Sequence, residues 1–353
     1  MRRSMKLAAV VLSGSLGMAS LAACGAKSTD TATAGASGSS GLKVGMAYDI
    51  GGRGDQSFND SAARGLDKAK ADLGVSVTEA DAKTGEAEAD KESRLRDLVS
   101  SGYNPVIAVG FVYQGAVEKV AKDNPNVKFA IIDSASATQP GNVTSLTFSE
   151  QEGSYLAGVA AASKTKTKTV GFIGGVQTEL IKKFEAGYTA GVKATNKDVN
   201  VLVTYLTTPP DFSGFASPDK GKEAALGQLD KGADVIYAAA GSSGNGSIEA
   251  VSQKAGAWAI GVDSDQAAQP ALAKYKNSIL TSMVKNVDTA VYSYIDSVKK
   301  GNAFTGVKNF DLKAEGLSLA TTGGHIDDIK GKLDDAAKAI TTGATTVPTA
   351  PAQ

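Results

Sequence analysis

Charged residues stand directly after four of the apolar, strand-like runs in this chain. They are Asp49, Asp133, Asp263 and Lys285. In open α/β sheets, ligands bind beyond the carboxyl ends of the strands, which is where these residues would lie. Three carboxylates against one lysine would repel a phosphate but suit a neutral molecule that carries hydroxyl and N–H donors. The pattern therefore predicts a polar binding site, although each residue taken singly is also typical of a cap or turn.

Two loops are expected at the same edge. The stretch GGRGDQSFND, residues 51–60, places Phe58 and Asn59 between an apolar run and a helix. Phe58 can offer a flat face and Asn59 both donors and acceptors, with packing of Phe58 into the core as the alternative. The stretch GSSGNG begins at Gly241, where glycine permits close backbone approach to a ligand or simply forms a turn. The GGRG segment lacks the Lys-Ser/Thr of a phosphate-binding loop.

Composition narrows the function further. The 353 residues suggest about two domains, and 37 basic against 37 acidic residues give no electrostatic footprint for nucleic acid. One cysteine and one histidine exclude disulfides, Cys/His metal sites and most histidine-based acid–base chemistry. This composition leaves an enzyme possible but without its usual groups, and we expect a binding protein with no cofactor and no metal rather than an enzyme. His325 is expected at the surface, and Trp258 in the core or on a lobe surface.

These residues need a scaffold, and the chain alternates between strand-like and helix-like stretches from Leu42 onward. The main helix-like stretches are 57–73, 86–101, 149–163, 179–196 and 219–231. Ser57 with Asp60, and Ser149 with Glu152, have the spacing of capping boxes. Alternation predicts α/β architecture with parallel sheets, and about ten strands exceed one open sheet. We therefore expect two doubly wound domains, with a first crossing near 143–151.

The N-terminus reads as an export signal. Arg2, Arg3 and Lys6 precede a short apolar stretch that ends in LAAC at Cys24. LAAC resembles the lipobox of bacterial lipoproteins, whose cysteine carries lipid, while a plain signal with an incidental cysteine is the alternative. This predicts a signal peptide over 1–23, a flexible tether over 24–41 and a disordered tail over 341–353.

Several blocks together resemble the basic membrane protein family of ABC-importer substrate-binding lipoproteins, one member type being the purine nucleoside receptor. The blocks run in order from DIGGRGDQSFNDSAARG through SLTFSEQEGSYLAG, GADVIYAAAGSSGNG and IGVDSDQ to SMVKNVDTA, and span about 42–320. The resemblance implies a type I periplasmic-binding fold with two lobes and a three-strand hinge. It places 42–147 and about 264–305 in lobe 1, and 148–263 and about 306–340 in lobe 2.

The resemblance also implies roles for individual residues. Asp49, Asn59 and Asp133 would read the base, and Phe58 and Phe215 would form the two walls around it. Asp263 and Lys285 would hold the ribose hydroxyls, with Gly241 as a backbone contact. Phe212 is an alternative to Phe215, and Asp265 an alternative to Asp263.

The expected function is capture of a nucleoside, purine by preference, and its delivery to an ABC permease. The protein would be a monomer on the extracytoplasmic face of the cell membrane, held by its lipid anchor only and binding no nucleic acid. A receptor for a sugar or signal molecule is the alternative on the same fold. A secreted nucleoside hydrolase fits less well, because the carboxylates are spread over four strands rather than clustered for a metal. A surface adhesin or immunogenic lipoprotein with no ligand is a further alternative, which an apolar, empty crevice would favour.

Overall fold

A computed structural model describes residues 41–83, 85–136 and 138–352. Gly41–Gln353 form one compact unit. The predicted signal peptide, the tether and Cys24 lie outside the described residues.

The first lobe is built on a sheet of six parallel strands in the order β11-β5-β4-β3-β1-β2. Its strands are β1 (Lys43–Ala47), β2 (Ser76–Ala80), β3 (Val106–Ala108), β4 (Phe129–Ile132), β5 (Val143–Phe148) and β11 (Gly306–Phe310). The buried runs of β1, β3 and β4 carry apolar side chains on both faces, as parallel strands covered by helices require.

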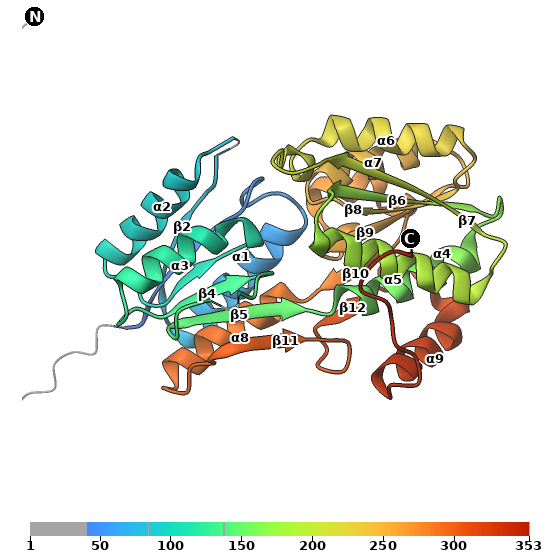
Figure 1. Ribbon diagram of the computed structural model, residues 1–353. Helices are drawn as coiled ribbons and strands as arrows, with labels where there is room; N and C mark the ends of the chain where they lie inside the picture. The colour runs from blue at the N-terminus through green and yellow to red at the C-terminus, as the bar shows by residue number, and fades with distance from the viewer. Residues whose placement is uncertain (1–40, 84, 137, 353) are drawn as a thin grey trace, which may run out of the picture. The chain divides into compact units, whose positions relative to one another are not determined.

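The second lobe has a sheet in the order β12-β10-β9-β8-β6-β7, parallel except for the antiparallel pair of β10 and β12. Its strands are β6 (Thr169–Val176), β7 (Asn200–Thr207), β8 (Val235–Ala239), β9 (Trp258–Asp263), β10 (Ile279–Lys285) and β12 (Leu317–Leu319). These two α/β sheets confirm the predicted fold class (Figure 1).

Helices cover both faces of each sheet. The α-helices are α1 (Phe58–Leu73), α2 (Glu88–Ser100), α3 (Gln114–Asp123), α4 (Glu150–Lys164), α5 (Glu179–Thr195), α6 (Pro218–Asp230), α7 (Ser243–Ser252), α8 (Val287–Lys299) and α9 (Lys330–Thr341). Short 3-10 helices are η1 (Phe111–Tyr113), η2 (Ser213–Phe215), η3 (Gln266–Ala268), η4 (Pro270–Ser278) and η5 (Asp327–Ile329). In the first lobe α1 packs on α8 and α2 on α3; in the second, α4 packs on α5 and α6 on α7.

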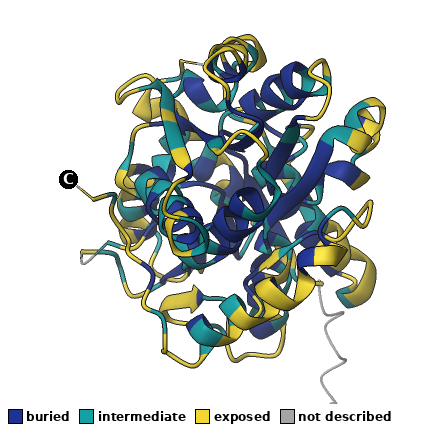
Figure 2. Cartoon of the chain, turned by 90° about the vertical axis from the view of Figure 1, so that its right-hand side faces the viewer, coloured by how far each residue is buried: buried dark blue, intermediate teal, exposed yellow. Residues whose placement is uncertain are grey.

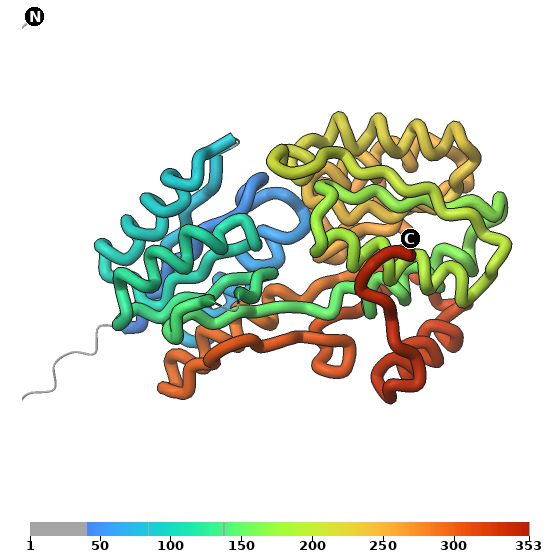
Figure 3. Tube along the Cα trace, in the orientation of Figure 1, coloured from blue at the N-terminus to red at the C-terminus, as the bar shows by residue number. Residues whose placement is uncertain are grey.

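The chain passes between the lobes three times, as Figure 3 shows in tube form. The crossings lie between β5 and α4, between β10 and α8, and between β11 and β12. The first of these is the predicted crossing near 143–151.

The strand pairing corrects the lobe boundaries expected near 264 and 306. Strand β10 pairs with β9 in the second lobe, and β11 pairs with β5 in the first. The chain therefore completes the second sheet before it returns, and β11 and β12 lie on opposite sides of the last crossing. Strand β11 is mostly exposed, so it has no apolar run by which the sequence could reveal it.

The largest core cluster contains side chains from both sheets and from the helices packed on them, and the central strands β3, β4 and β8 are buried throughout (Figure 2). The disordered tail expected at 341–353 is also corrected. Val347, beyond the end of α9, is buried against Leu156 and Ile340. This side chain packs against α4 and α9 and anchors the segment.

Helices α1 and α4 begin where predicted, but neither predicted capping box forms. The side chains of Ser57 and Ser149 make no cap hydrogen bond to their helices. The hydroxyl of Ser57 instead points away from its helix and donates to Asp263 in the second lobe.

Candidate functional site

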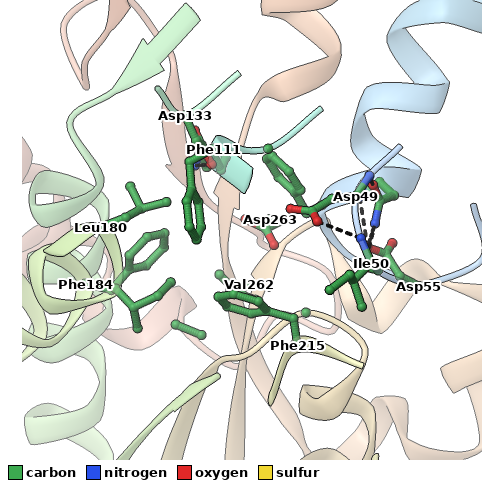
Figure 4. Close-up of a pocket in the computed structure, with 17 residues that line it drawn as sticks. Asp49, Ile50, Asp55, Phe111, Asp133, Leu180, Phe184, Phe215, Val262 and Asp263 are labelled. Carbon is green, nitrogen blue, oxygen red and sulfur yellow. Dashed lines mark hydrogen bonds and ion pairs between the residues drawn. The ribbon is translucent and has the colours of Figure 1, made fainter. Parts of the chain in front are cut away.

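All eight residues predicted for the ligand site line one pocket, and they come from both lobes. The pocket contains about 560 Å³ of space not filled by protein atoms, a volume that includes the part open to solvent. Asp49 and Asp133 follow strands of the first sheet, and Asp263 and Lys285 end strands of the second. Figure 4 shows Asp49, Asp133 and Asp263 facing this space together with the rings of Phe111, Phe184 and Phe215.

The loop from Asp49 to α1 is organised by Asp55, which the sequence analysis missed. Its carboxylate accepts hydrogen bonds from the backbone N–H groups of Ser57 (2.8 Å), Asn59 (2.9 Å) and Asp60 (3.1 Å). These are the free N–H groups of the first helical turn, so Asp55 does the capping that was assigned to Ser57. This fixes Phe58 at the first position of α1, beside the pocket.

Asn59 is held by the same loop. Its Nδ2 donates to Asp55 (3.0 Å) and to the carbonyl of Ile50 (3.3 Å), and its Oδ1 accepts from the backbone N–H of Asp49 (3.0 Å). Both amide protons are therefore engaged within the loop. Asn59 lines the pocket but offers it only the remaining lone pair of its oxygen.

Asp49 is buried and depends on a glycine for its place. A Cβ at Gly110, whose φ is +101°, would lie 2.1 Å from Asp49 Oδ2. Only a residue without a side chain lets the carboxylate approach this backbone, and only glycine adopts this φ readily. Burial raises the pKa of Asp49 to about 7.

Asp133 and Asp263 share an unusual backbone. Their φ values are +65° and +63°, in the left-handed region that non-glycine residues rarely adopt. Such conformations cost about 1–3 kcal/mol and occur preferentially at functional sites. Burial raises the pKa of Asp133 to about 6, although Lys285 opposes the rise, and raises that of Asp263 to about 7.

Lys285 is the cation among the pocket-lining residues that the structure describes, and its side chain is 1% exposed. Its Nζ lies 2.6 Å from Asp133 Oδ2 and 3.1 Å from Glu150 Oε1. The rings of Phe58, Phe148 and Phe184 lie 4.9–5.6 Å from the same nitrogen. Burial alone would lower the pKa of Lys285, but the surrounding carboxylates, Asp133 first, hold it above its ordinary value.

The two aspartates beside Lys285 have different partners. Lys285 contacts Asp133 directly, whereas Asp263 Oδ2 accepts a hydrogen bond of 2.6 Å from the hydroxyl of Ser57. One oxygen of Asp133, Oδ1, is buried without a hydrogen-bond partner among the described residues. Asp133 therefore pairs with Lys285 through Oδ2 and can accept a hydrogen bond from a ligand at Oδ1.

Of the two candidate walls in the second lobe, Phe215 lines the pocket and Phe212 does not. Phe111, which follows β3 in the first lobe, meets both rings edge-on, with centroids 5.9 Å from Phe212 and 6.4 Å from Phe215. Gly241 has φ +56°, and a Cβ there would lie 2.8 Å from the carbonyl of Phe215. Glycine at 241 thus allows the segment of Phe215 to pack closely.

Direct hydrogen bonds join the lobes around the loop of Asp55. Ser264 Oγ donates to the carbonyl of Ser57 (2.7 Å), and Asn245 Nδ2 donates to the carbonyl of Asp55 (3.1 Å). Gln266 Nε2 donates to the carbonyl of Gln56 (3.2 Å). With the bond from Ser57 to Asp263, these contacts hold the lobes together on one side of the pocket.

Several pocket residues escaped the sequence analysis. Besides Asp55 they include Ile50, Gly110, Phe111, Leu180, Ile181, Phe184, Ala239 and Val262. Phe111 carried a usable signal, because an aromatic residue directly after the apolar run 105–110 is exposed unless something covers it. Leu180 and Phe184 lie on the amphipathic helix α5, where an apolar side chain that faces a ligand looks like one that faces the core.

Other candidates lie apart from the pocket. Asp265 accepts a hydrogen bond from Thr322, and the rings of His325 and Trp258 lie 4.7 Å apart, all outside the pocket lining. Among the described residues no cluster of His, Cys, Asp or Glu could hold a metal ion. Within that same part of the chain, no helix combines the length and apolar character needed to span a membrane.

Comparison with known proteins agrees with this architecture. The model of the PnrA-like ABC transporter substrate-binding proteins matches residues 42–339. The chain is 36% identical over 333 residues to the ABC transporter nucleoside-binding protein BmpA of Lactococcus lactis subsp. cremoris, covering 87% of this chain and 89% of that one. It is 34% identical over 362 residues to a CD4+ T-cell-stimulating antigen of Listeria monocytogenes, covering 99% and 98%.

A solved structure extends the agreement to the fold. An ABC transporter solute-binding protein from Aeropyrum pernix K1 superposes with a TM-score of 0.75 at 30% identity, covering 87% of this chain and 94% of that one. The predicted resemblance to the basic membrane proteins is confirmed, and the family consists of binding proteins rather than enzymes. This chain belongs to the PnrA-like family of ABC transporter substrate-binding proteins.

Proposed function

We propose that this protein captures a neutral nucleoside, purine by preference, between its two lobes and delivers it to an ABC permease. The observation that carries the proposal is the lining of the pocket: carboxylates outnumber cations, and aromatic rings come from both lobes. A flat heterocycle can stack on such rings, and sugar hydroxyls and base N–H groups can donate to the carboxylates. The Lactococcus relative is named a nucleoside-binding protein, which supports the same ligand class.

The residues divide into two groups by what they can offer. Phe58 and Phe215 are half-buried and lie in opposite lobes, as two walls of a stack require. Asp49, Asp133 and Asp263 supply acceptors, and Lys285 supplies a donor. We assign the base to the aromatic walls with Asp49, and the ribose hydroxyls to Asp133, Asp263 and Lys285.

Ligand binding would favour closure because the ligand contacts both lobes at once. The three crossings provide the hinge, and the permease would recognise the closed form. Among ligands, a nucleoside is favoured over a nucleotide because the pocket already holds several carboxylates around a single lysine in its described lining.

The direct test is to identify the ligand and then remove the walls. We expect native mass spectrometry of the purified protein to detect a bound nucleoside. Phe58→Ala and Phe215→Ala should each weaken its binding by about 1–3 kcal/mol, the range for one base–aromatic stack. Phe212→Ala is the matched control and should change affinity less, because this ring lies outside the lining. A bound sugar, or full affinity in both wall variants, would contradict the proposal.

Anchoring is a separate part of the proposal. We propose that Cys24 becomes the lipid-bearing N-terminus, on the order of basic, apolar and LAAC residues before it. Stable anchoring takes more than one acyl chain. Cys24→Ser should therefore release the protein from the membrane or leave the precursor uncleaved, as fractionation and intact mass would show. Normal processing and membrane retention of this variant would contradict the anchor.

A further inference from the structure

Lys285 lies where two of the three crossings meet the pocket. It is the last residue of β10, directly before the second crossing, and Glu150 is the first residue of α4, directly after the first crossing. Asp133 completes the group from the end of β4. Lys285 lies between the two carboxylates, with its Nζ 2.6 Å from Asp133 Oδ2 and 3.1 Å from Glu150 Oε1, and each of the three side chains is at most 5% exposed.

Counting donors shows what this group leaves for a ligand. An ammonium group has three N–H donors. Asp133 Oδ2, at 2.6 Å, and Glu150 Oε1, at 3.1 Å, each face the Lys285 nitrogen. Assigning one donor to each carboxylate leaves one N–H for the pocket that Lys285 lines. Glu150 itself does not line that pocket, so any effect it has on the ligand passes through Lys285.

The surroundings of Glu150 make it a strong partner for the lysine. Its position at the start of α4 favours a negative charge, because the helix dipole places partial positive charge there. Its second oxygen, Oε2, has no hydrogen-bond partner among the described residues, and Lys183 Nζ lies 3.6 Å from it. Glu150 Oε1 is therefore the atom that fixes the Lys285 ammonium from the side opposite to the first lobe.

We propose that Glu150 is a positioning residue for ligand recognition: with Asp133 it orients the Lys285 ammonium so that its remaining N–H is directed at a hydroxyl of the ligand. The role rests on the proposed nucleoside function, since the hydroxyls belong to the ribose. Without Glu150 the Lys285 ammonium can turn toward Asp133 alone. Its remaining N–H is then no longer held at a fixed position relative to Asp133 Oδ1, the acceptor beside it. Recognition of the sugar is then weakened while stacking of the base is unchanged.

The test compares Glu150→Gln with Glu152→Gln. Glutamine keeps the shape of the side chain and removes the charge. Glu152 stands in the same first turn of α4 but accepts from the backbone of Leu312 and does not contact Lys285. Calorimetry with guanosine and with guanine separates the sugar from the base. We expect Glu150→Gln to lose about tenfold or more in guanosine affinity and less than about twofold in guanine affinity. Glu152→Gln should bind both ligands as the unaltered protein does.

A second measurement needs no ligand. In protein carrying ¹⁵N-labelled lysine, a buried ammonium held by two carboxylates exchanges its protons slowly and gives a distinct resonance, which Lys285→Met assigns by removing it. Glu150→Gln should shift or broaden this resonance, and Glu152→Gln should leave it in place. If Glu150→Gln fails to fold, Glu150→Asp serves instead, because it keeps the charge and withdraws the oxygens by one methylene.

The outcomes separate this inference from the proposed function. An unchanged resonance in the Glu150 variant, or an equal loss of guanosine and guanine affinity, overturns the positioning role. A perturbed resonance together with no guanosine binding by the unaltered protein supports the positioning of Lys285 and overturns the nucleoside function instead.

Discussion

Asp55 and Asp133 are both buried beside the same pocket, but the protein satisfies them to different degrees. Asp55 accepts four hydrogen bonds from its own loop, and this loop is joined to the second lobe by hydrogen bonds that involve no ligand. Asp133 has Lys285 on one oxygen and no partner on the other among the described residues. On the loop side of the pocket, around Asp55 and Ser57, the hydrogen-bonding groups are satisfied within the protein. On the hinge side, around Asp133, Lys285 and Glu150, an acceptor and a donor remain for a ligand.

This difference separates the residues that build the pocket from those that recognise its contents. Buried acceptors without partners are costly, and a ligand that donates to them recovers that cost. Changes on the hinge side should therefore distinguish between ligands, and changes on the loop side should affect all ligands alike.

The largest effect is expected for Lys285→Met. It leaves two buried carboxylates, Asp133 and Glu150, without their cation, which typically costs about 3–5 kcal/mol of folding stability. Guanosine binding should also be lost. Urea denaturation measures the first effect and calorimetry the second. Lys182→Met, which removes an exposed pair with Glu179, is the control and should cost less than about 1 kcal/mol. Equal stability of the two variants would mean that Asp133, Lys285 and Glu150 do not form a tight ion network.

A smaller effect is expected from pH, with opposite signs for binding and folding. The pKa values of Asp49, Asp133 and Asp263 are raised by burial to about 7, about 6 and about 7. Ionised carboxylates accept stronger hydrogen bonds, so guanosine affinity should rise by about tenfold between about pH 5.5 and 8, with protons released on binding.

The unliganded protein should behave in the opposite way. Each of these aspartates has an ordinary pKa of 3.8, so between about pH 4 and 7 the folded chain holds protons that the unfolded chain has released. Folding stability should therefore fall as pH rises through this window. Denaturation series at several pH values check the sign of this change in stability. A guanosine affinity that is independent of pH would show that these carboxylates do not contact the ligand.

The smallest effect is expected on the loop side. Ser57→Ala removes the hydroxyl that donates to Asp263 across the lobes at 2.6 Å, a bond worth about 1 kcal/mol. Because this contact holds the lobes together and uses only Oδ2 of Asp263, whose other oxygen stays available to the ribose, guanosine and guanine should lose the same factor, about fivefold. Ser252→Ala, whose hydroxyl bonds only within α7, is the control. A loss confined to guanosine would place Ser57 among the residues that recognise the sugar.

The sequence predicted the pocket better than it predicted the lobes. Asp49, Asp133, Asp263 and Lys285 were found because a charge after a buried parallel strand lies at the edge where loops meet, whatever the strand order. The order itself is set by long-range pairing. Strand β10 joins the second sheet and β11 the first, and no local pattern in either strand distinguishes its sheet.

The missed residues show the same limit at the level of side chains. Glu150 stands two residues after β5, like the other charges at strand ends. The contact on which its proposed role depends is with Lys285, a residue 135 positions later (285 − 150) that the fold brings beside it. The spacing of Ser57 and Asp60 fits a capping box, but Asp55 takes the N–H groups and frees the serine for the other lobe. In both cases a tertiary contact decided between partners that the local sequence leaves equivalent.

We propose that the pocket selects a neutral nucleoside because its lining accepts many hydrogen bonds and donates few. Titration calorimetry of guanosine, adenosine, their 5′-monophosphates and the free bases in one buffer tests it most directly. A monophosphate adds about −1.5 to −2 charges to a pocket that already holds several carboxylates around Lys285. We expect a nucleoside to bind at least about a hundredfold more tightly than its monophosphate, a gap of about 2.7 kcal/mol, and more tightly than its free base. Equal or tighter binding of a monophosphate would show that the carboxylates do not surround the ligand as proposed.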